Sequence, residues 1–126
     1  MTWHISLSAW TPHYRRKLKL VALPSINAAL AYATGPVQII LHTDEPDDFK
    51  DVHFACDVIF RKFHGNTVGD SIYNSYGQAD RMAIEMAPEE ANIAFLASDI
   101  MVSSEFFQAS ENGSRKASGV LSVRRH

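Results

Sequence analysis

Cysteine is almost absent from this sequence, which contains only Cys56 among 126 residues. A single cysteine excludes an internal disulfide framework and any zinc site built from several cysteines, and it fits a reducing compartment. No apolar run approaches the roughly 20 residues that a membrane span requires, and the amino terminus lacks a basic segment followed by an apolar signal core. We therefore expect a cytoplasmic protein without a membrane span, in which Cys56 is a small buried residue.

Motifs of several enzyme classes are missing as well. The sequence has no Gly-x-Ser-x-Gly elbow, no Gly-x-x-x-x-Gly-Lys loop and no Gly-x-Gly-x-x-Gly fingerprint, which argues against hydrolases, P-loop proteins and Rossmann dehydrogenases. Its six histidines include no pair four residues apart, the spacing of a helical metal site. We expect His42, within a predicted strand, to be a core or rim residue whose hydrogen bonds are satisfied.

A basic surplus is also lacking, because the formal net charge is -2. Binding to the phosphates of nucleic acid needs a basic surface, so a generic nucleic-acid binder is disfavoured. Hydrophobic residues make up 46% of the chain, which suffices for one core of modest size. No linker or repeat interrupts it, and only 110–119 has the composition of a loop, so residues 1–126 are predicted to form a single domain.

Hydrophobic periodicity predicts alternating strands and helices. We expect strands over 3–9, 37–42, 56–60, from 92 onward and over 119–123, with helices over 24–33, 71–87 and 105–107, the last capped by Ser103. The start of the first helix is left open: it begins at Pro24, or it begins earlier and Pro24 is a kink. This order predicts an α/β fold: a three-layer αβα sandwich with a mostly parallel, Rossmann-like sheet.

The helix over 71–87 is predicted to bury one stripe of apolar residues at spacings of three and four, namely Ile72, Tyr76, Ala79, Ala83 and Met86. Asp80 lies at the edge of this stripe, where it can reach a ligand. Arg81 lies on the opposite face and is expected to be a solvated charge.

Acidic residues follow two of the predicted strands, at the end where open α/β sheets bind ligands. Asp99 comes after the strand that begins at Asn92, where it either holds a metal or only stabilises a turn. Asp44 and Glu45 follow the strand over 37–42, as contacts for a ligand's hydroxyl or base, or as an acidic turn before Pro46.

The segment after the first strand is basic and aromatic, with His13, Tyr14, Arg15, Arg16, Lys17 and Lys19. Its arginines and lysines could contact a diphosphate while a base stacks on Trp10 or Tyr14. It could also bind single-stranded nucleic acid, or be a solvated helical face.

Together these residues resemble the N-terminal, nucleotide-sugar-binding half of glycosyltransferases with the GT-A fold. The matching positions are Ser8 to Trp10, His42 to Glu45, Asn74, Gln78 to Arg81, Ala83, Ile84, Ala87 and Phe95 to Ile100. The resemblance implies a nucleotide-diphospho-sugar donor, an acceptor that the residues do not identify, and donor contacts from Ser8, Trp10, Asp44, Glu45 and Asp80. It also implies that Asp99 holds Mg²⁺ or Mn²⁺, although Ala97 replaces the first carboxylate of the family's Asp-x-Asp motif. It identifies no catalytic residue.

Members of this family normally continue into an acceptor-binding half, whereas this sequence stops at His126. We expect a glycosyltransferase-like protein that is part of an enzyme, that completes its site by forming a homodimer, or that is a degenerate copy kept for binding alone. The alternative is a non-enzymatic α/β interaction domain that self-associates through an exposed sheet edge or apolar face.

Overall fold

The structure is a computed structural model that describes residues 2–66, 69, 71–88, 90–107 and 120–122. Its elements in chain order are β1 (Trp3–Ala9), α1 (Pro12–Lys17), the π-helical turn η1 (Leu18–Ala22), α2 (Leu23–Leu30), β2 (Val37–Thr43), the 3-10 turn η2 (Pro46–Phe49), β3 (Asp57–Lys62), α3 (Ser71–Met86), β4 (Asn92–Ala97) and β5 (Val120–Ser122).

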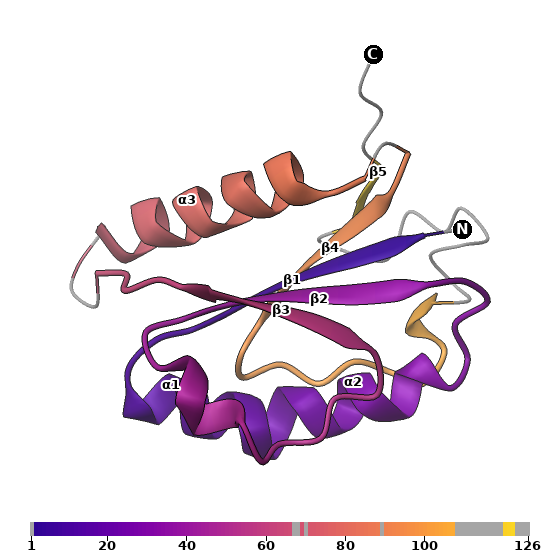
Figure 1. Cartoon of the computed structure of the whole chain (residues 1–126), viewed down its shortest axis with the longest axis horizontal. Coiled ribbons are helices and arrows are strands. Elements are labelled where there is room, and N and C mark those ends of the chain that lie inside the picture. Colours follow the sequence, from indigo (N-terminus) through magenta and orange to yellow (C-terminus); the bar gives the residue numbers. More distant parts are fainter. Residues whose placement is uncertain (1, 67–68, 70, 89, 108–119, 123–126) are drawn as a thin grey trace.

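The strands form one sheet in the order β3-β2-β1-β4-β5. The first four strands run parallel, and β5 pairs antiparallel with β4. Helices α1 and α2 lie below the sheet and α3 lies above it (Figure 1). The predicted three-layer α/β fold with a mostly parallel sheet is therefore confirmed.

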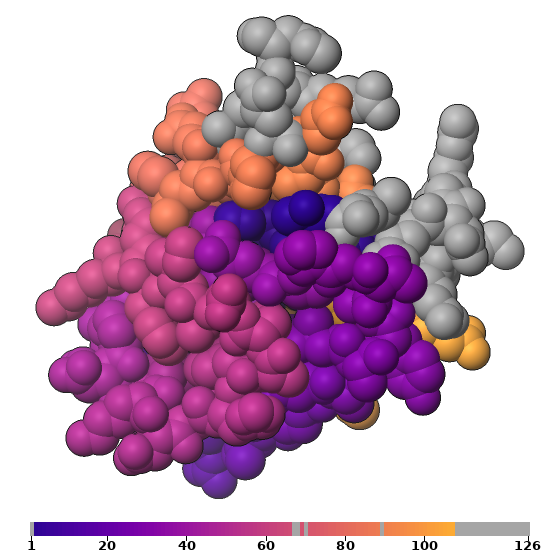
Figure 2. Space-filling view, turned by 45° about the vertical axis from the view of Figure 1, so that its right-hand side comes forward, coloured from indigo at the N-terminus to yellow at the C-terminus, as the bar shows by residue number. Residues whose placement is uncertain are grey.

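Strand β1 lies at the point where the chain changes direction across the sheet. From β1 the chain moves outward to β2 and β3, then returns through α3 to place β4 on the other side of β1. In the space-filling view the β1 segment is enclosed between the segments of β2 and β4 (Figure 2). Such a switch point leaves a crevice at the carboxyl ends of the two strands, where open α/β sheets bind ligands.

The face of the sheet toward α1 and α2 carries the main apolar core. Alternation along β1 directs Trp3, Ile5 and Leu7 to this face, and all three are fully buried. The ring of Phe107 meets Trp3 edge-on, with 5.3 Å between ring centroids. At about 25 cal/mol per Å² of buried apolar surface, this cluster supplies most of the hydrophobic stabilisation.

The first helical run begins at Pro12, the earlier of the two starts that the sequence left open. Pro24 is accommodated inside it by the π-helical turn η1, in which the Leu23 amide donates to the carbonyl of Leu18, five residues back. Because proline has no amide proton and its ring clashes with the carbonyl four residues back, the wider turn lets the run continue through α2.

The other face of the sheet is more polar and is covered by α3. Strand β1 presents His4, Ser6 and Ser8 to it, all buried. The helix contacts this face through Ser75, Ala79 and Ala83. The predicted stripe is right at the two alanines and wrong at Met86, which is 39% exposed. The buried positions Ser75, Ala79 and Ala83 repeat every four residues. Their small side chains let the helix lie close to the sheet.

Several local predictions can be compared with the described residues. Strand β4 ends at Ala97, and Ser103 begins a turn by accepting the amide of Glu105 on its hydroxyl. Cys56, expected to be buried, is only partly buried where it packs against the main core, and burial followed by the charge of Asp57 raises its pKa to about 11. The predicted loop at 110–119 lies outside the described residues. No helix in the described part of the chain combines the length and apolar character needed to cross a membrane.

Candidate functional site

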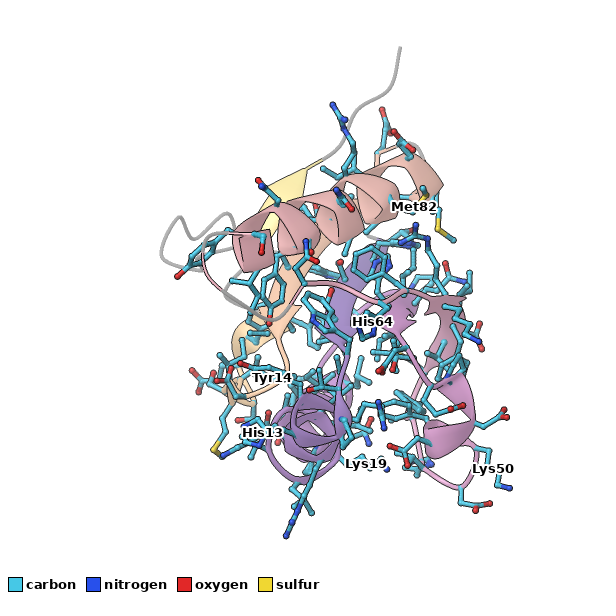
Figure 3. The ribbon with its side chains drawn as sticks, turned by 90° about the vertical axis from the view of Figure 1, so that its left-hand side faces the viewer. His13, Tyr14, Lys19, Lys50, His64 and Met82 are labelled. Carbon is cyan, nitrogen blue, oxygen red and sulfur yellow. The ribbon has the colours of Figure 1, made fainter. Side chains whose placement is uncertain are left out.

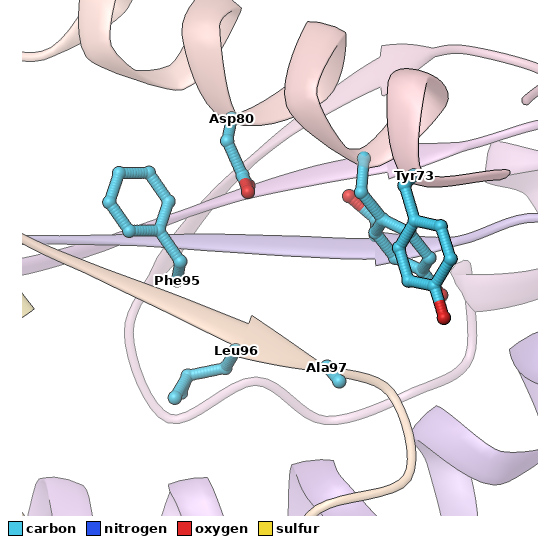
Figure 4. Close-up of a pocket in the computed structure, with 7 residues that line it drawn as sticks. Tyr73, Asp80, Phe95, Leu96 and Ala97 are labelled. Carbon is cyan, nitrogen blue, oxygen red and sulfur yellow. The ribbon is translucent and has the colours of Figure 1, made fainter. Parts of the chain in front are cut away.

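A pocket of about 350 Å³ lies at the switch point between β1 and β4, beneath the first half of α3. Its described lining is Ser8, Tyr73, Tyr76, Asp80, Phe95, Leu96 and Ala97. The Asp80 side chain extends from α3 toward β4, Phe95 rises from β4 toward the helix, and Tyr73 stands at the other end (Figure 4). The volume is at the lower end of ligand sites, so the pocket suits one ring system rather than a whole nucleotide sugar.

Asp80 is the charged group within this pocket. Its Oδ1 accepts a hydrogen bond from the Ser6 hydroxyl at 3.1 Å, and no cation pairs with it among the described residues. Burial raises the pKa of Asp80, and the Ser6 hydrogen bond offsets only part of this effect. The carboxylate therefore retains acceptor capacity that a ligand's N–H or O–H groups could satisfy.

Tyr76 links the pocket to the loop that follows β4. Burial raises the pKa of its hydroxyl, and the nearby groups Tyr14, Asp99 and Asp80 raise it further. Asp99 is exposed, so its carboxylate is open to a ligand beside the pocket. The phenol of Tyr76 stays protonated at neutral pH and can donate a hydrogen bond.

Trp10 supports the pocket from behind instead of lining it. Its indole is 1% exposed, stacks at a tilt on Tyr76 with 4.8 Å between ring centroids, and donates to the carbonyl of Asn66. Gly65 makes this packing feasible, because a Cβ there would lie 2.6 Å from the indole ring. From the sequence we expected that a base could stack on Trp10. The buried indole leaves no exposed ring face for such stacking in this arrangement.

Asp44 holds the β1–α1 loop against the end of β2. Its two oxygens accept the Thr11 amide at 3.1 Å and the Arg15 guanidinium at 2.6 Å. Partial burial alone would raise the pKa of Asp44, but the hydrogen bonds from Arg15 and Thr11 lower it overall. Thr11 has φ 77° and ψ 151°, a backbone region that belongs almost exclusively to glycine. Strain of this kind tends to occur at functional sites.

The cations of the basic segment differ in whether they form ion pairs. Arg15 and Lys19 both bind Asp48, at 2.9 and 2.6 Å, so these two cations face the acidic turn η2. His13 and Lys19 lie on opposite sides of the helix, with Lys19 on the side toward Lys50 (Figure 3). Phosphate contact by Arg15 or Lys19 would compete with these ion pairs, whereas Arg16 remains exposed.

One row of residues crosses the sheet beside the pocket, with Ala97, Ser8, His42 and Arg61 in register on neighbouring strands. Arg61 can only donate, so its 3.2 Å contact assigns the role of acceptor to Nδ1 of His42 and places the proton on Nε2. That Nε2 is buried without a hydrogen-bond partner among the described residues. His42 is therefore a core residue, as predicted, but its hydrogen bonds are only half satisfied. Burial, followed by the charge of Arg61, lowers its pKa to about 4.

Residues 2–66, 69, 71–88, 90–107 and 120–122 contain no group of three or more histidine, cysteine or acidic side chains placed to hold a metal ion. A metal held by protein ligands alone does not fit this part of the chain. Asp99 does fit the weaker arrangement in which one carboxylate and a ligand's phosphate oxygens share a Mg²⁺ ion.

The predicted site residues therefore separate into groups. Ser8 and Asp80 line the pocket, and Asp99 is near its Tyr76. Asp44 is occupied by the β1–α1 loop, while Glu45 is exposed.

The sequence prediction missed two aromatic lining residues, Tyr73 and Phe95, and placed Tyr76 only in a core stripe. Tyr73 and Tyr76 precede Asp80 by seven and four residues, and this helical spacing is the signal that could have found both tyrosines.

Comparison with protein-family models and with curated proteins found no match to this sequence. Among solved structures, the chain is similar to a crystal structure of S. aureus TarS 1-349, a glycosyltransferase. The TM-score is 0.60 at 12% sequence identity, and the match covers 89% of this chain and 32% of the TarS chain. At this identity the likeness shows the fold alone, and this chain spans about a third of TarS. The resemblance expected from the sequence is thus supported at the level of a Rossmann-like, glycosyltransferase-like fold.

Proposed function

We propose that this chain binds a nucleotide-diphospho-sugar donor and acts as the donor-binding half of a glycosyltransferase-like protein. The observation that carries the proposal is the pocket at the switch point between β1 and β4, where Ser8 and Asp80 meet an aromatic lining. An aromatic pocket with few polar groups fits one ring of a nucleotide sugar, and the rest of such a ligand would extend past the carboxyl ends of the strands. The fold shared with TarS supports the same interpretation.

The charge around the pocket implies how a diphosphate would be held. Asp80 and Asp99 are acidic, and Arg15 is already paired with Asp44 and Asp48. A divalent cation bound by Asp99 together with the diphosphate would remove the repulsion between them. When bound, such an ion would also stabilise the negative charge of a departing nucleoside diphosphate. The residues around the pocket identify neither an acceptor nor a catalytic base.

Ligand-dependent thermal stability tests the donor proposal. The chain is heated with a panel of nucleoside diphosphates and nucleotide sugars, each with Mg²⁺ or Mn²⁺. A ligand at 100 times its dissociation constant stabilises the folded state by about 2.7 kcal/mol, which gives a clear rise in Tm. The absence of a shift with every ligand at millimolar concentration would contradict the proposal.

The role of Asp99 needs a separate variant. Asp99→Asn should abolish the dependence of nucleotide binding on Mn²⁺ while leaving the melting temperature of the free protein unchanged, because a turn after a strand accepts either residue. The control is Asp47→Asn, which removes an exposed carboxylate from η2. Unchanged Mn²⁺ dependence in Asp99→Asn would assign this residue to the turn alone.

Self-association is the second candidate function, favoured by the edge strand β3. The strand pairs only with β2 in the described sheet, and Ile59 and Phe60 on its two faces are 37% and 38% exposed. A symmetric dimer could continue the sheet across this edge and bury about 1,000 Å² or more. Light scattering over a dilution series tests this, with Ile59→Lys expected to shift a dimer to monomer. A mass of 14.1 kDa at high micromolar concentration would rule the dimer out.

A further inference from the structure

The pocket has one charged group in its described lining, the carboxylate of Asp80. Among the described residues, the partly buried Asp80 accepts only the Ser6 hydroxyl, at 3.1 Å, and Ser8 provides a buried polar side chain of the lining. The remaining walls are Phe95 and Ala97 of β4 and the tyrosines of α3, while the Leu96 side chain packs into the main core on the other face of the sheet. An occupant must therefore offer hydrogen-bond donors along one edge and apolar faces elsewhere.

This distribution disfavours the sugar and the diphosphate as occupants. A sugar ring carries hydroxyl groups around its whole edge, and those facing Phe95 and Ala97 would lose their hydrogen bonds. A diphosphate would meet the carboxylate of Asp80, which has no cation beside it among the described residues. A flat nucleobase stacked against the aromatic side chains meets neither penalty.

The four common bases differ in what they present to a carboxylate. Guanine offers two adjacent donors, N1–H and the 2-amino group, which match the two oxygens of a carboxylate. Uracil places its single N3–H between two carbonyl oxygens, which a carboxylate repels. Adenine and cytosine each place a ring nitrogen acceptor beside the amino group. Hydrogen bonds to a charged partner are about twice as strong as neutral ones, so this match decides between the bases.

We infer that the pocket beneath α3 binds a guanine base, with Asp80 accepting N1–H and the 2-amino group and Phe95, Tyr73 and Tyr76 contacting the ring. The inference rests on the proposed function, because it names the base of the donor. Tyr73 is 74% exposed and stands at the mouth, where it can close over a bound ring. Ser6 keeps the carboxylate directed into the pocket.

Calorimetric titration with GDP, IDP and UDP, each with Mg²⁺, tests the inference. IDP differs from GDP only in lacking the 2-amino group, so it isolates one of the two hydrogen bonds. We expect GDP to bind at least about tenfold more tightly than IDP or UDP. Asp80→Asn should weaken GDP binding by at least about tenfold and remove the preference over UDP, since an amide cannot accept both donors.

Glu85→Gln is the matched control, because it removes an exposed carboxylate from the same helix and should leave all affinities unchanged. Asp80→Asn keeps an acceptor for Ser6, and its melting curve verifies folding. UDP binding as tight as GDP, or unaltered GDP binding in Asp80→Asn, would overturn the guanine assignment while the donor proposal stands. Failure of all three nucleotides to bind would overturn the guanine assignment, whereas the donor proposal is overturned only when every ligand of the wider panel also fails.

Discussion

The two faces of the sheet are built from the same strands but by different chemistry. Below, large apolar side chains such as Trp3 and Leu7 fill the space against α1 and α2. Above, β1 contributes Ser6 and Ser8, and α3 approaches through Ser75, Ala79 and Ala83. One residue step along β1 changes the face, so a single strand serves both.

The difference separates stability from binding. A close-packed apolar face leaves no room for a ligand, and every atom removed from it weakens folding. The polar face contains groups whose hydrogen bonding or solvation is incomplete. Among the described residues, Nε2 of His42 has no hydrogen-bond partner, and burial raises the pKa of Asp80. Perturbed groups beside a pocket are typical of sites that bind or react.

The largest effect is expected from paired substitutions of neighbouring residues on opposite faces. Leu7→Ala deletes a fully buried side chain from the main core and should lower the free energy of unfolding by about 2 to 5 kcal/mol. Ser6→Ala removes one hydrogen bond to Asp80 and should lower it by about 1 kcal/mol. Urea denaturation measures both. Equal losses would show that the polar face contributes as much to stability as the apolar one.

The next prediction concerns acid and the buried histidine. The pKa of His42 is lowered from 6.5 to about 4, so the unfolded chain takes up a proton at pH values where the native side chain stays neutral. Stability should therefore fall as pH drops from about 6.5 toward 4, by up to about 3 kcal/mol from this residue. His42→Gln should flatten the pH dependence in that window.

Urea denaturation at pH 7 and pH 4.5 measures this effect. The control is His53→Gln, which replaces an exposed histidine and should keep the wild-type dependence. The lowered pKa values of Asp44 and Asp48 act at more acidic pH, because their stabilisation is lost only as pH falls through those values. An unchanged slope in His42→Gln would mean that His42 titrates normally in the folded protein.

Two glycines allow a test of the packing behind the pocket. Gly65→Ala places a Cβ 2.6 Å from the Trp10 ring and 2.8 Å from Cβ of Ser75, and should destabilise the fold by about 1 to 3 kcal/mol. Gly77→Ala adds a methyl group where nothing lies within 4 Å, on the exposed side of α3, and should stabilise it by about 0.5 to 1 kcal/mol. Thermal melts give both signs. A stable Gly65→Ala variant would show that Trp10 is free to move.

The smallest effects are expected in the ion pairs between α1 and the acidic turn. Arg15 contacts both Asp44 and Asp48 and is the less exposed cation, so Arg15→Gln should lower stability by about 1 kcal/mol. Lys19→Gln breaks one exposed pair and should lower it by about 0.5 kcal/mol or less. The difference between the two variants in free energy of unfolding should become smaller at high salt than at low salt, because salt screens both ion pairs. A larger loss for Lys19→Gln would reverse this ranking.

Local pattern was enough to predict the strands and the layer order. Alternation and β-branched residues marked β1 and β2, and apolar residues at spacings of three and four marked α3. Met86 was misplaced because apolar character was taken as evidence of burial, whereas close approach to the sheet selected small residues instead. The sequence could not decide between a helix that begins before Pro24 and passes it through a π-helical turn and a helix that begins at Pro24. Both satisfy the same local preferences of proline.

The candidate site shows the same division. The sequence placed Asp44 and Asp99 at strand ends and Asp80 at the edge of the apolar stripe of α3, because an acid after a short strand and the periodicity of a helix are both local patterns. It could not show that Arg15 occupies Asp44, although the spacing of four in Arg15 and Lys19 matches that of Asp44 and Asp48. Nor could it bring Tyr73 and Phe95 into one pocket, because they belong to different elements.

The sequence by itself determined the order of elements, the alternation that makes β1 apolar on one side and polar on the other, and the carboxylates at the strand ends. These features depend on residues that are close to each other in the sequence. Only the tertiary structure decided which carboxylate faces a pocket and which is neutralised by an ion pair. That choice depends on the reversal of strand order at β1, which brings α3 and β4 together around Asp80 while α1 closes over Asp44.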